Sequence, residues 1–323
     1  MARAVNLIVS CTNRKRFEVL PETAVHDVGG RDLETRLKLW KANLRNATAA
    51  EHPADNVYIG DHWSIVHAIP TEARQLGLGV KLWVCSAGYG LIRPETPIKA
   101  YRATFTRGEN DYVASGLIED QNTLHRWWKG VCSYRFSSQH MAARTISEMA
   151  AAFPRTPLVV ALSADYLKAV AEDLAAVLVR PYFQDHLSIV SCGTPQPHPI
   201  WKHNLLPCDG SLASSLGGTL TSLNARVARR LLYSLDGTEP TVWRLTQLAH
   251  SINLCPRTTT PARVPTSDAD VARFIQSHLT ASPMTSKTRL LREFRGNGLA
   301  CEQKRFGELY SKVRSRLLAG AYA

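Results

Sequence analysis

The stretch "VNLIVSCTNRKR", residues 5–16, contains both the strand that decides the fold and the first candidate site. Residues 5–9 form a short apolar run rich in β-branched side chains, which is typical of a parallel strand buried on both faces. The run ends in Ser10 and Cys11, and three consecutive cations follow at residues 14–16. Because doubly wound sheets bind ligands at the carboxyl ends of their strands, this ending predicts either a ligand-binding loop or only the polar end of a strand.

Three later stretches repeat the pattern of an apolar run that ends in small polar residues. They are "VKLWVCSAGYGLI" (residues 80–92), "PLVVALSADY" (residues 157–166) and "LSIVSCGT" (residues 187–194). Amphipathic helical stretches such as residues 31–50 lie between these runs, with apolar residues on one helical face. Strands that alternate with helices predict an α/β domain with a mainly parallel sheet flanked by helices.

The C-terminal part of the chain has a different composition. A Gly-, Pro- and Thr-rich stretch precedes three short helical patterns, and a Gly-Asn-Gly turn at residues 296–298 separates the last two. We therefore predict an α/β catalytic domain at residues 1–240, a linker at residues 241–264 and a basic all-α, helix-turn-helix-like module at residues 265–323. The alternative is a basic helical hairpin packed on the main domain.

The net charge of the chain is +12, and it is concentrated near the C-terminus. Residues 284–323 contain nine Lys or Arg residues and three acidic residues. A concentrated positive charge predicts a polyanionic partner, in most proteins a nucleic acid. The residues predicted to contact a nucleic-acid backbone are Arg102, Arg107, Arg289, Arg292, Arg295, Gln303, Lys304 and Arg305.

Other classes of protein are disfavoured by the sequence. No apolar run reaches about 18 residues, so we expect no transmembrane helix, and the N-terminus lacks a signal-peptide pattern. The seven cysteines are scattered and never form a CxxC pair, which predicts a cytoplasmic protein without a disulfide framework. We expect no cofactor and no metal, although a metal site at Cys192, His198, His203 and Cys208 stays open.

Reactive side chains follow the predicted strands and define a candidate active site. A thiolate is the reactive form of cysteine, and neighbouring cations such as Arg14 favour it at Cys11. Lys15 is expected to bind an anion or to take part in the reaction, and the flanking Arg14 and Arg16 are expected to lower its pKa. The predicted catalytic residues are Cys11, Lys15, Cys85, Glu95 and Asp165. The predicted substrate-binding residues are Ser10, Asn13, Arg14, Ser86, Gly88, Tyr89, Gly90, Tyr101 and Tyr166.

Three segments resemble a known family. The segments "SCTNRKR" (residues 10–16), "CSAGYGLIRPETPIKAYRATF" (residues 85–105) and "VVALSADYL" (residues 159–167) are similar to the YaaA-related α/β proteins of phage and defence islands. The Cys-x-x-x-Lys spacing of Cys11 and Lys15 also resembles a motif in the core domain of archaeosine synthase. Within the family the chain looks most like the DpdC proteins, which belong to a bacterial system that inserts 7-deazaguanine bases into DNA.

The resemblance implies a reaction and a partner. It implies that 7-cyano-7-deazaguanine in DNA is converted to the 7-amido base by nitrile hydration, with Cys11 forming a thioimidate. Lys15, Glu95 or Asp165 would move protons, backbone amides near Gly88 would stabilise charge, and no cofactor would be needed. The base would leave the duplex and stack on Tyr89 or Tyr101. DNA and other proteins of the same modification system would be the partners, with no membrane contact.

Alternatives remain open at this level. A non-catalytic protein that binds modified DNA would use the same crevice, and a base-excising, glycosylase-like enzyme would use Asp61, Glu95 or Asp165. An enzyme that acts on a free nucleoside or nucleotide would not need the basic C-terminal residues. Arg16 and Phe17 replace the Pro-Tyr of the archaeosine motif, which disfavours addition of lysine to the nitrile. The sequence leaves open whether DNA, transfer RNA or a nucleoside is the substrate.

Overall fold

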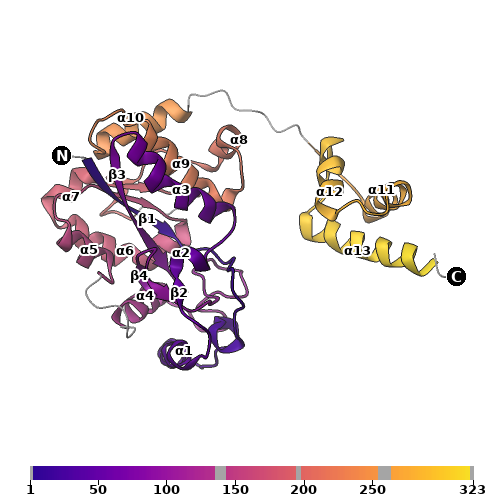
Figure 1. Cartoon of the computed structure of the whole chain (residues 1–323), viewed down its shortest axis with the longest axis horizontal. Coiled ribbons are helices and arrows are strands. Elements are labelled where there is room, and N and C mark those ends of the chain that lie inside the picture. The colour runs from indigo at the N-terminus through magenta and orange to yellow at the C-terminus, as the bar shows by residue number, and fades with distance from the viewer. Residues whose placement is uncertain (1–2, 135–142, 194–197, 254–262, 321–323) are drawn as a thin grey trace. The chain divides into compact units, whose positions relative to one another are not determined.

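The apolar run at residues 5–9 lies within β1, a central strand of a five-stranded sheet in the computed structural model (Figure 1). The structure describes residues 3–134, 143–193, 198–253 and 263–320. Across the sheet the strands follow the order β4 (Gly90–Ile92), β3 (Leu78–Ser86), β1 (Arg3–Ser10), β6 (Leu158–Ala161) and β7 (Leu187–Val190). The predicted α/β class with a mainly parallel sheet is therefore confirmed.

The register of the sheet brings the strand ends together. Ser10 of β1 pairs with Cys85 of β3, and Val9 pairs with Ala161 of β6, all in parallel. Within this sheet β4 pairs antiparallel: the chain reverses after Ser86, and Gly90, with a φ of 77°, pairs back with Ser86. A positive φ favours glycine, which explains the residue at this position. The carboxyl ends of β1, β3 and β6 consequently lie at one edge of the sheet.

Helices cover both faces of the sheet (Figure 1). One face is covered by α3 (Asp61–Gln75), α9 (Leu223–Tyr233) and α10 (Val242–Asn253). The other face is covered by α4 (Thr123–Ser133), α5 (Ile146–Ala152) and α6 (Ala164–Leu178), and α1 (Leu33–Asn46) packs against α4. The shorter elements of this part are β2 (His52–Pro53), α2 (Ala54–Val57), β5 (Pro97–Ile98), α7 (Pro181–His186) and α8 (Ala213–Leu216).

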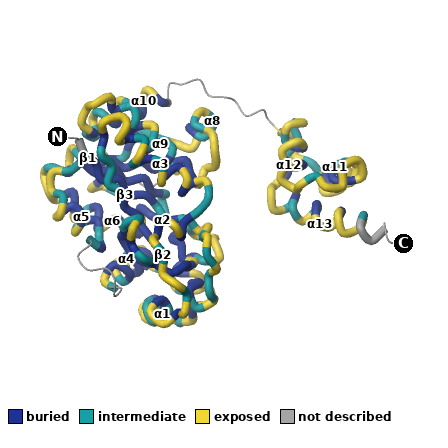
Figure 2. Tube along the Cα trace, viewed as in Figure 1, coloured by how far each residue is buried: buried dark blue, intermediate teal, exposed yellow. Residues whose placement is uncertain are grey.

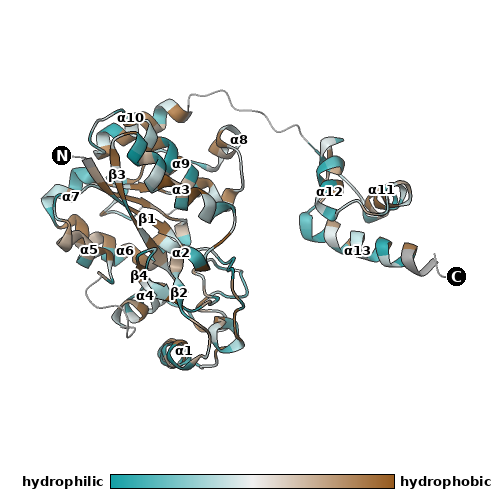
Figure 3. Cartoon of the chain, viewed as in Figure 1, coloured by the Kyte–Doolittle hydropathy of each residue, from teal (hydrophilic) through white to brown (hydrophobic). Residues whose placement is uncertain are grey.

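The strands and the inner faces of these helices form one hydrophobic core (Figure 2). The strands are almost uniformly apolar, whereas the helices alternate between apolar and polar faces (Figure 3). Asp32 begins α1 by accepting a 2.8 Å hydrogen bond from the amide of Thr35. At the other end of α1, the buried ammonium of Lys99 donates to the carbonyls of Leu44, Arg45 and Ala47. No helix in the described ranges is long and apolar enough to span a bilayer.

Helix α10 occupies much of the range predicted as a linker, residues 241–264. Its apolar residues Leu245, Ala249 and Ile252 are buried, and the helix packs against α7 and α9. The chain divides into two compact units, Met1–Arg257 and Thr258–Ala323. The first unit therefore extends beyond residue 240, because α10 packs on it. The Thr- and Pro-rich stretch that suggested a linker begins only after α10.

The second unit has its own hydrophobic core. It contains α11 (Asp268–Ala281), α12 (Lys287–Gly296), α13 (Gln303–Gly320) and a parallel ladder of β8 (Val264–Pro265) with β9 (Leu299–Ala300). Ile275, Phe294 and Phe306 are fully buried between the three helices. The prediction of three helices agrees with this unit, but the prediction of an all-α module needs correction because of the short ladder.

Candidate functional site

The loop after β1 is held in place by backbone pairing. The amide of Arg14 donates to Thr12 Oγ1 at 3.2 Å, which turns the chain immediately after Cys11. Lys15 then forms an antiparallel bridge with Tyr58, and the amide of Ile59 donates to the carbonyl of Arg14 at 3.2 Å. The segment that precedes α3 therefore fixes the direction in which residues 13–15 project.

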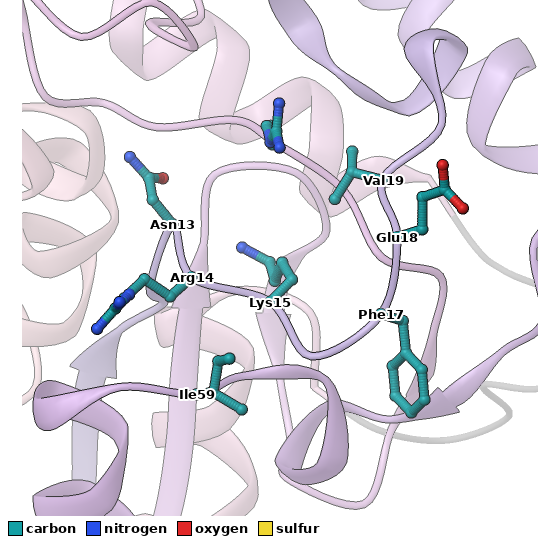
Figure 4. A pocket seen from close by; sticks show the side chains of 8 residues that line it. Asn13, Arg14, Lys15, Phe17, Glu18, Val19 and Ile59 are labelled. Atoms are coloured by element: carbon teal, nitrogen blue, oxygen red, sulfur yellow. The ribbon is translucent and has the colours of Figure 1, made fainter. Parts of the chain in front are cut away.

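These residues form one side of a cavity of about 610 Å³ (Figure 4). The cavity is lined by Asn13, Arg14, Lys15, Phe17, Glu18, Val19, Ile59 and Arg102. Its walls carry three cations and a single carboxylate, and its volume lies in the usual range for small-ligand sites. The cavity is consequently suited to a polar or anionic ligand with a flat apolar part.

Lys15 is the most unusual charged group of the cavity. Its ammonium lies 4.4 Å from the ring centre of Tyr101 and 5.2 Å from that of Tyr58, and it donates to the carbonyl of Thr12. Burial lowers the pKa of Lys15 from 10.5 to about 8, while the charges of Cys11 and Asp111 act in the opposite direction. Lys15 can therefore exchange a proton near neutral pH far more readily than an ordinary lysine.

Cys11 is buried, with 7% of its surface exposed. Its sulfur is 3.3 Å from the hydroxyl of Tyr166, and its charge contributes to the raised pKa of Tyr101. The charge of Cys11 raises the pKa of Lys15, so the two groups interact electrostatically. Lys15 lines the cavity, whereas Cys11 does not.

Buried tyrosines surround Cys11. The hydroxyl of Tyr101 is 2.6 Å from Ser86 Oγ and 2.9 Å from the hydroxyl of Tyr58. Burial first, and then the charge of Cys11, raise the pKa of Tyr58, Tyr101 and Tyr166 well above 10. These hydroxyls stay protonated at neutral pH, and that of Tyr166 is the one within hydrogen-bond distance of the sulfur among the described contacts.

Several residues predicted for the site have structural roles instead. Cys85 is fully buried in β3, where burial raises its pKa well above 9, so it is not a nucleophile. Gly88, Tyr89 and Gly90 are also buried, and Tyr89 bonds the backbone of Lys99. The prediction that a base stacks on Tyr89 or Tyr101 is therefore wrong, because neither ring is exposed.

The predicted carboxylates also lie away from the cavity walls. Glu95 is exposed and pairs with Arg93 at 3.5 Å. Asp165 lies 3.7 Å from the ammonium of Lys168 and accepts a hydrogen bond from the amide of Arg107. Neither carboxylate lines the cavity that contains Lys15, so the structure does not support either one as the proton donor.

The remaining predicted residues of the first unit divide into two groups. Asn13, Arg14 and Arg102 line the cavity as expected for ligand-binding residues. The carbonyl of Ser10 accepts a 2.9 Å hydrogen bond from the ring of His62, whose pKa burial lowers, and so Ser10 positions the loop. The side chain of Arg107 pairs with Glu119 at 2.7 Å and lines a different cavity.

Sequence reasoning missed residues that reach the site from distant segments. Tyr58 and Asp111 both affect Lys15, and Asp111 is fixed by a 2.6 Å contact with His26. Nothing in the spacing of these residues links them to "SCTNRKR". The apolar stretch around Tyr58 signalled an ordered segment, but only the bridge to Lys15 shows where that segment lies.

The second unit carries an excess of exposed cations. Its exposed Lys and Arg residues without an ion pair to any described residue are Arg263, Lys287, Arg289, Arg292, Lys304, Lys312, Arg314 and Arg316. A Cβ at Gly307 would lie 3.3 Å from Lys287 Cδ, so the stem of this lysine packs against α13. The cations of α12 and α13 are therefore close enough to act on one polyanion.

Most acids of the second unit are already engaged. Asp268 pairs with Arg305, Asp270 with Arg273, and Glu293 with His278. Glu302 caps α13 by accepting from two backbone amides at 2.9 Å. Arg305, predicted as a nucleic-acid contact, is thus part of an internal ion pair. Arg295, predicted for the same role, donates to the carbonyl of Cys301. Gln303 is exposed at the start of α13.

The possible metal site at Cys192, His198, His203 and Cys208 is not assembled. Among the described residues, no group of three or more His, Cys, Asp or Glu side chains is placed to hold a metal ion. His198 stacks on Trp201 with ring centres 5.8 Å apart, and His203 is exposed. Cys192 and Cys208 do interact, because the side chain of Cys208 raises the pKa of the Cys192 thiol.

The geometry therefore combines a thiol, a lysine with a lowered pKa and a cationic cavity at the carboxyl edge of a parallel sheet. Comparisons with models of protein families, with curated proteins and with solved structures gave no match for this chain.

Proposed function

We propose that this protein hydrates the nitrile of 7-cyano-7-deazaguanine in DNA and so produces the 7-amido base. The observation that carries the proposal is the position of Lys15 at the wall of the cationic cavity with its pKa lowered to about 8. Nitrile hydration needs a group that both gives and takes protons near neutral pH, and it needs a nucleophile nearby. Cys11 supplies the nucleophile in this scheme. The resemblance to the YaaA-related proteins adds the class of substrate.

The shape of a nitrile suits the depth of the site. A nitrile is linear and thin, so the base can occupy the cavity of about 610 Å³ while the nitrile passes Lys15 towards Cys11. Arg14 and Arg102 border the cavity and are suited to the phosphates that flank an extruded nucleotide. This arrangement replaces stacking on Tyr89 or Tyr101, which are buried.

The first step joins the sulfur of Cys11, as thiolate, to the nitrile carbon. Lys15 gives a proton to the nitrile nitrogen, which produces a thioimidate and a neutral lysine. Water then adds to the same carbon while Lys15 takes a proton from the water and passes it to the nitrogen. The carbon–sulfur bond breaks, Cys11 leaves as thiolate, and the hydroxyl proton returns to Lys15 as the amide forms. Tyr101 and Tyr166 would stabilise the thiolate by donating hydrogen bonds.

The second unit supports DNA as the carrier of the base. Its exposed cations on α12 and α13 form no ion pair with any described residue, which favours a polyanionic ligand over a free nucleoside. In this proposal the second unit is the helix-turn-helix-like module that holds the DNA backbone. Binding should weaken as salt increases, because each phosphate contact releases counterions.

The direct test is to incubate the protein with DNA that carries the 7-cyano base and to identify the nucleosides by mass spectrometry. Gain of one water at the modified nucleoside is expected with the native chain and with Cys208→Ser, whose cysteine lies outside the cavity. An unchanged nitrile with correctly folded protein contradicts the proposal. Release of free base with abasic sites would favour the base-excising alternative, and tight binding without product would favour a non-catalytic one.

A further inference from the structure

Two cysteines outside the proposed active site are brought together by strand pairing. Leu205 forms a parallel bridge with Ile189 of β7, and the amide of Leu206 donates to the carbonyl of Ile189 at 2.8 Å. Cys192 and Cys208 each lie three residues beyond this bridge. The amide of Cys208 donates to the carbonyl of Leu206 at 2.8 Å, which turns the chain at Pro207, and a Cβ at Gly210 would lie 3.7 Å from the carbonyl oxygen of Cys192. The segment that carries Cys208 therefore passes beside Cys192.

The two thiols differ in accessibility. Cys192 is 6% exposed, and its amide donates to Asn224 Oδ1 at 2.7 Å, which fixes its backbone. The side chain of Cys208, and after it burial, raise the pKa of the Cys192 thiol. Cys208 is only half-buried. An oxidant from solvent would therefore meet Cys208 first, while Cys192 remains a thiol beside it.

We infer that Cys192 and Cys208 form a redox-sensitive dithiol that hydrogen peroxide converts to a reversible disulfide. The Cys208 thiolate attacks one peroxide oxygen and the O–O bond breaks, leaving a sulfenic acid and releasing water after protonation. The Cys192 sulfur then attacks the Cys208 sulfur, the S–S bond forms, and the hydroxyl leaves as a second water with the Cys192 proton. Two thiols are oxidised and one peroxide is reduced, so the step is balanced.

The consequence of the disulfide concerns a second cavity of the first unit. His198 and Trp201 follow Cys192 in the chain and line a cavity of about 670 Å³ together with residues of α4 and α6. A disulfide would tether the chain on both sides of these two residues. The segment that carries His198 and Trp201 should therefore have less conformational freedom in the oxidised protein than in the reduced protein.

The test uses the reduced full-length protein treated with hydrogen peroxide, followed by alkylation of the remaining thiols, proteolysis and mass spectrometry. The expected product is a cross-linked peptide that joins Cys192 to Cys208 and disappears after reduction with dithiothreitol. The variant Cys192→Ser should leave a sulfenic acid at Cys208 that dimedone traps. The variant Cys301→Ser, which removes a buried cysteine of the second unit, should form the cross-link as the native chain does.

Three outcomes would overturn the inference. The first is a native chain in which Cys192 and Cys208 both remain alkylatable after peroxide treatment. The second is oxidation of Cys208 to sulfinic acid while Cys192 stays free, which would show that Cys192 does not resolve the sulfenic acid. The third is a cross-link that joins either cysteine to a different partner.

Discussion

At the scale of single residues, Lys15 has a charge state set by groups from four segments of the chain. The sequence predicted a lowered pKa and attributed it to the neighbouring Arg14 and Arg16. The structure confirms the direction but gives a different cause, because burial dominates and Arg102 is the cation that contributes. Adjacent residues in a loop often point apart, so spacing alone does not identify which charges interact.

The lowered pKa of Lys15 predicts the pH dependence of the proposed reaction. If Lys15 gives a proton to the nitrile, the rate should fall as pH rises through about 8, because the charged form is lost there. Asp111 raises this pKa, so Asp111→Asn should move the fall to lower pH. Arg102 lowers it, so Arg102→Gln should move the fall to higher pH. Rates of amide formation measured across pH would check both shifts, and a profile insensitive to both variants would exclude Lys15 as the proton donor.

The position of Cys11 predicts a strong dependence of activity on its sulfur. Cys11→Ala should abolish amide formation, and Cys11→Ser should reduce it by about 100-fold or more, because an alcohol is a weaker nucleophile than a thiolate. Tyr166→Phe, which removes the hydroxyl 3.3 Å from the sulfur, should have a smaller effect. The same nucleoside assay measures all three variants. Amide formation by Cys11→Ala at the native rate would remove the thioimidate from the mechanism.

At the scale of elements, the turn between β3 and β4 shows how a sequence motif can be misinterpreted. The Gly-Tyr-Gly of residues 88–90 predicted a turn that approaches a ligand. The structure shows that Gly88 instead makes room for Tyr101, since a Cβ there would lie 2.5 Å from the Tyr101 ring. The glycine thus allows close packing beneath the site, and it influences the site only through Tyr101.

Replacement of Gly88 by alanine should therefore destabilise the first unit. The added methyl group must displace Tyr101, and overpacking of this kind costs about 1–3 kcal/mol of unfolding free energy. Gly29→Ala is the matched control, because nothing lies within 4 Å of a Cβ at Gly29. Urea unfolding of both variants would measure the difference. Equal stability of the two variants would contradict the packing role.

Lys99 predicts a second effect on stability at the end of α1. Its buried ammonium donates to Leu44, Arg45 and Ala47 carbonyls at 3.0, 3.2 and 2.6 Å. Lys99→Met keeps most of the volume but leaves these carbonyls without their donor, which should cost about 2 kcal/mol. Lys38→Met, at an exposed position of the same helix, should have little effect. Thermal or urea unfolding would check the comparison.

The sequence predicted elements better than it predicted contacts. The strands β1, β3, β6 and β7 were recognisable because each is a short apolar run that ends in polar residues. The antiparallel strand β4 was missed, because its three residues are too few to show a periodic pattern. The site was predicted in part: Asn13, Arg14, Lys15 and Arg102 line one cavity, but the tyrosine cluster near them depends on packing that no local pattern reveals.

At the scale of the whole molecule, the excess of positive charge is concentrated in the second unit. The second unit has many exposed cations that pair with no described acid, and its own acids are mostly consumed in ion pairs and a helix cap. Composition alone predicted this excess near the C-terminus. It did not predict that Arg295 and Arg305 are used internally, because that assignment depends on contacts with Cys301 and Asp268.

The exposed cations of the second unit predict how DNA binding depends on salt. Replacement of Lys287, Arg292 and Lys312 by glutamine should weaken binding and reduce the slope of log K against log salt by roughly 0.9 for each phosphate that is no longer neutralised. Arg273→Gln is the control in the same unit, since Arg273 is paired with Asp270. Fluorescence anisotropy with labelled duplex at several salt concentrations would give the slopes. A slope unchanged in the triple variant would exclude these residues from the interface.

The short ladder between β8 and β9 determines at which residue an expression fragment of the second unit should begin. Val264 donates its amide to the carbonyl of Gly298 at 2.8 Å, and Thr266 donates to Ala300 at 3.2 Å. Arg263 also bonds the carbonyl of Arg295. A fragment that starts at residue 265, as the composition suggested, would lose part of this pairing. An expression fragment of the second unit should therefore begin upstream of Arg263. It then retains the segment that pairs with β9, the connection between α12 and α13.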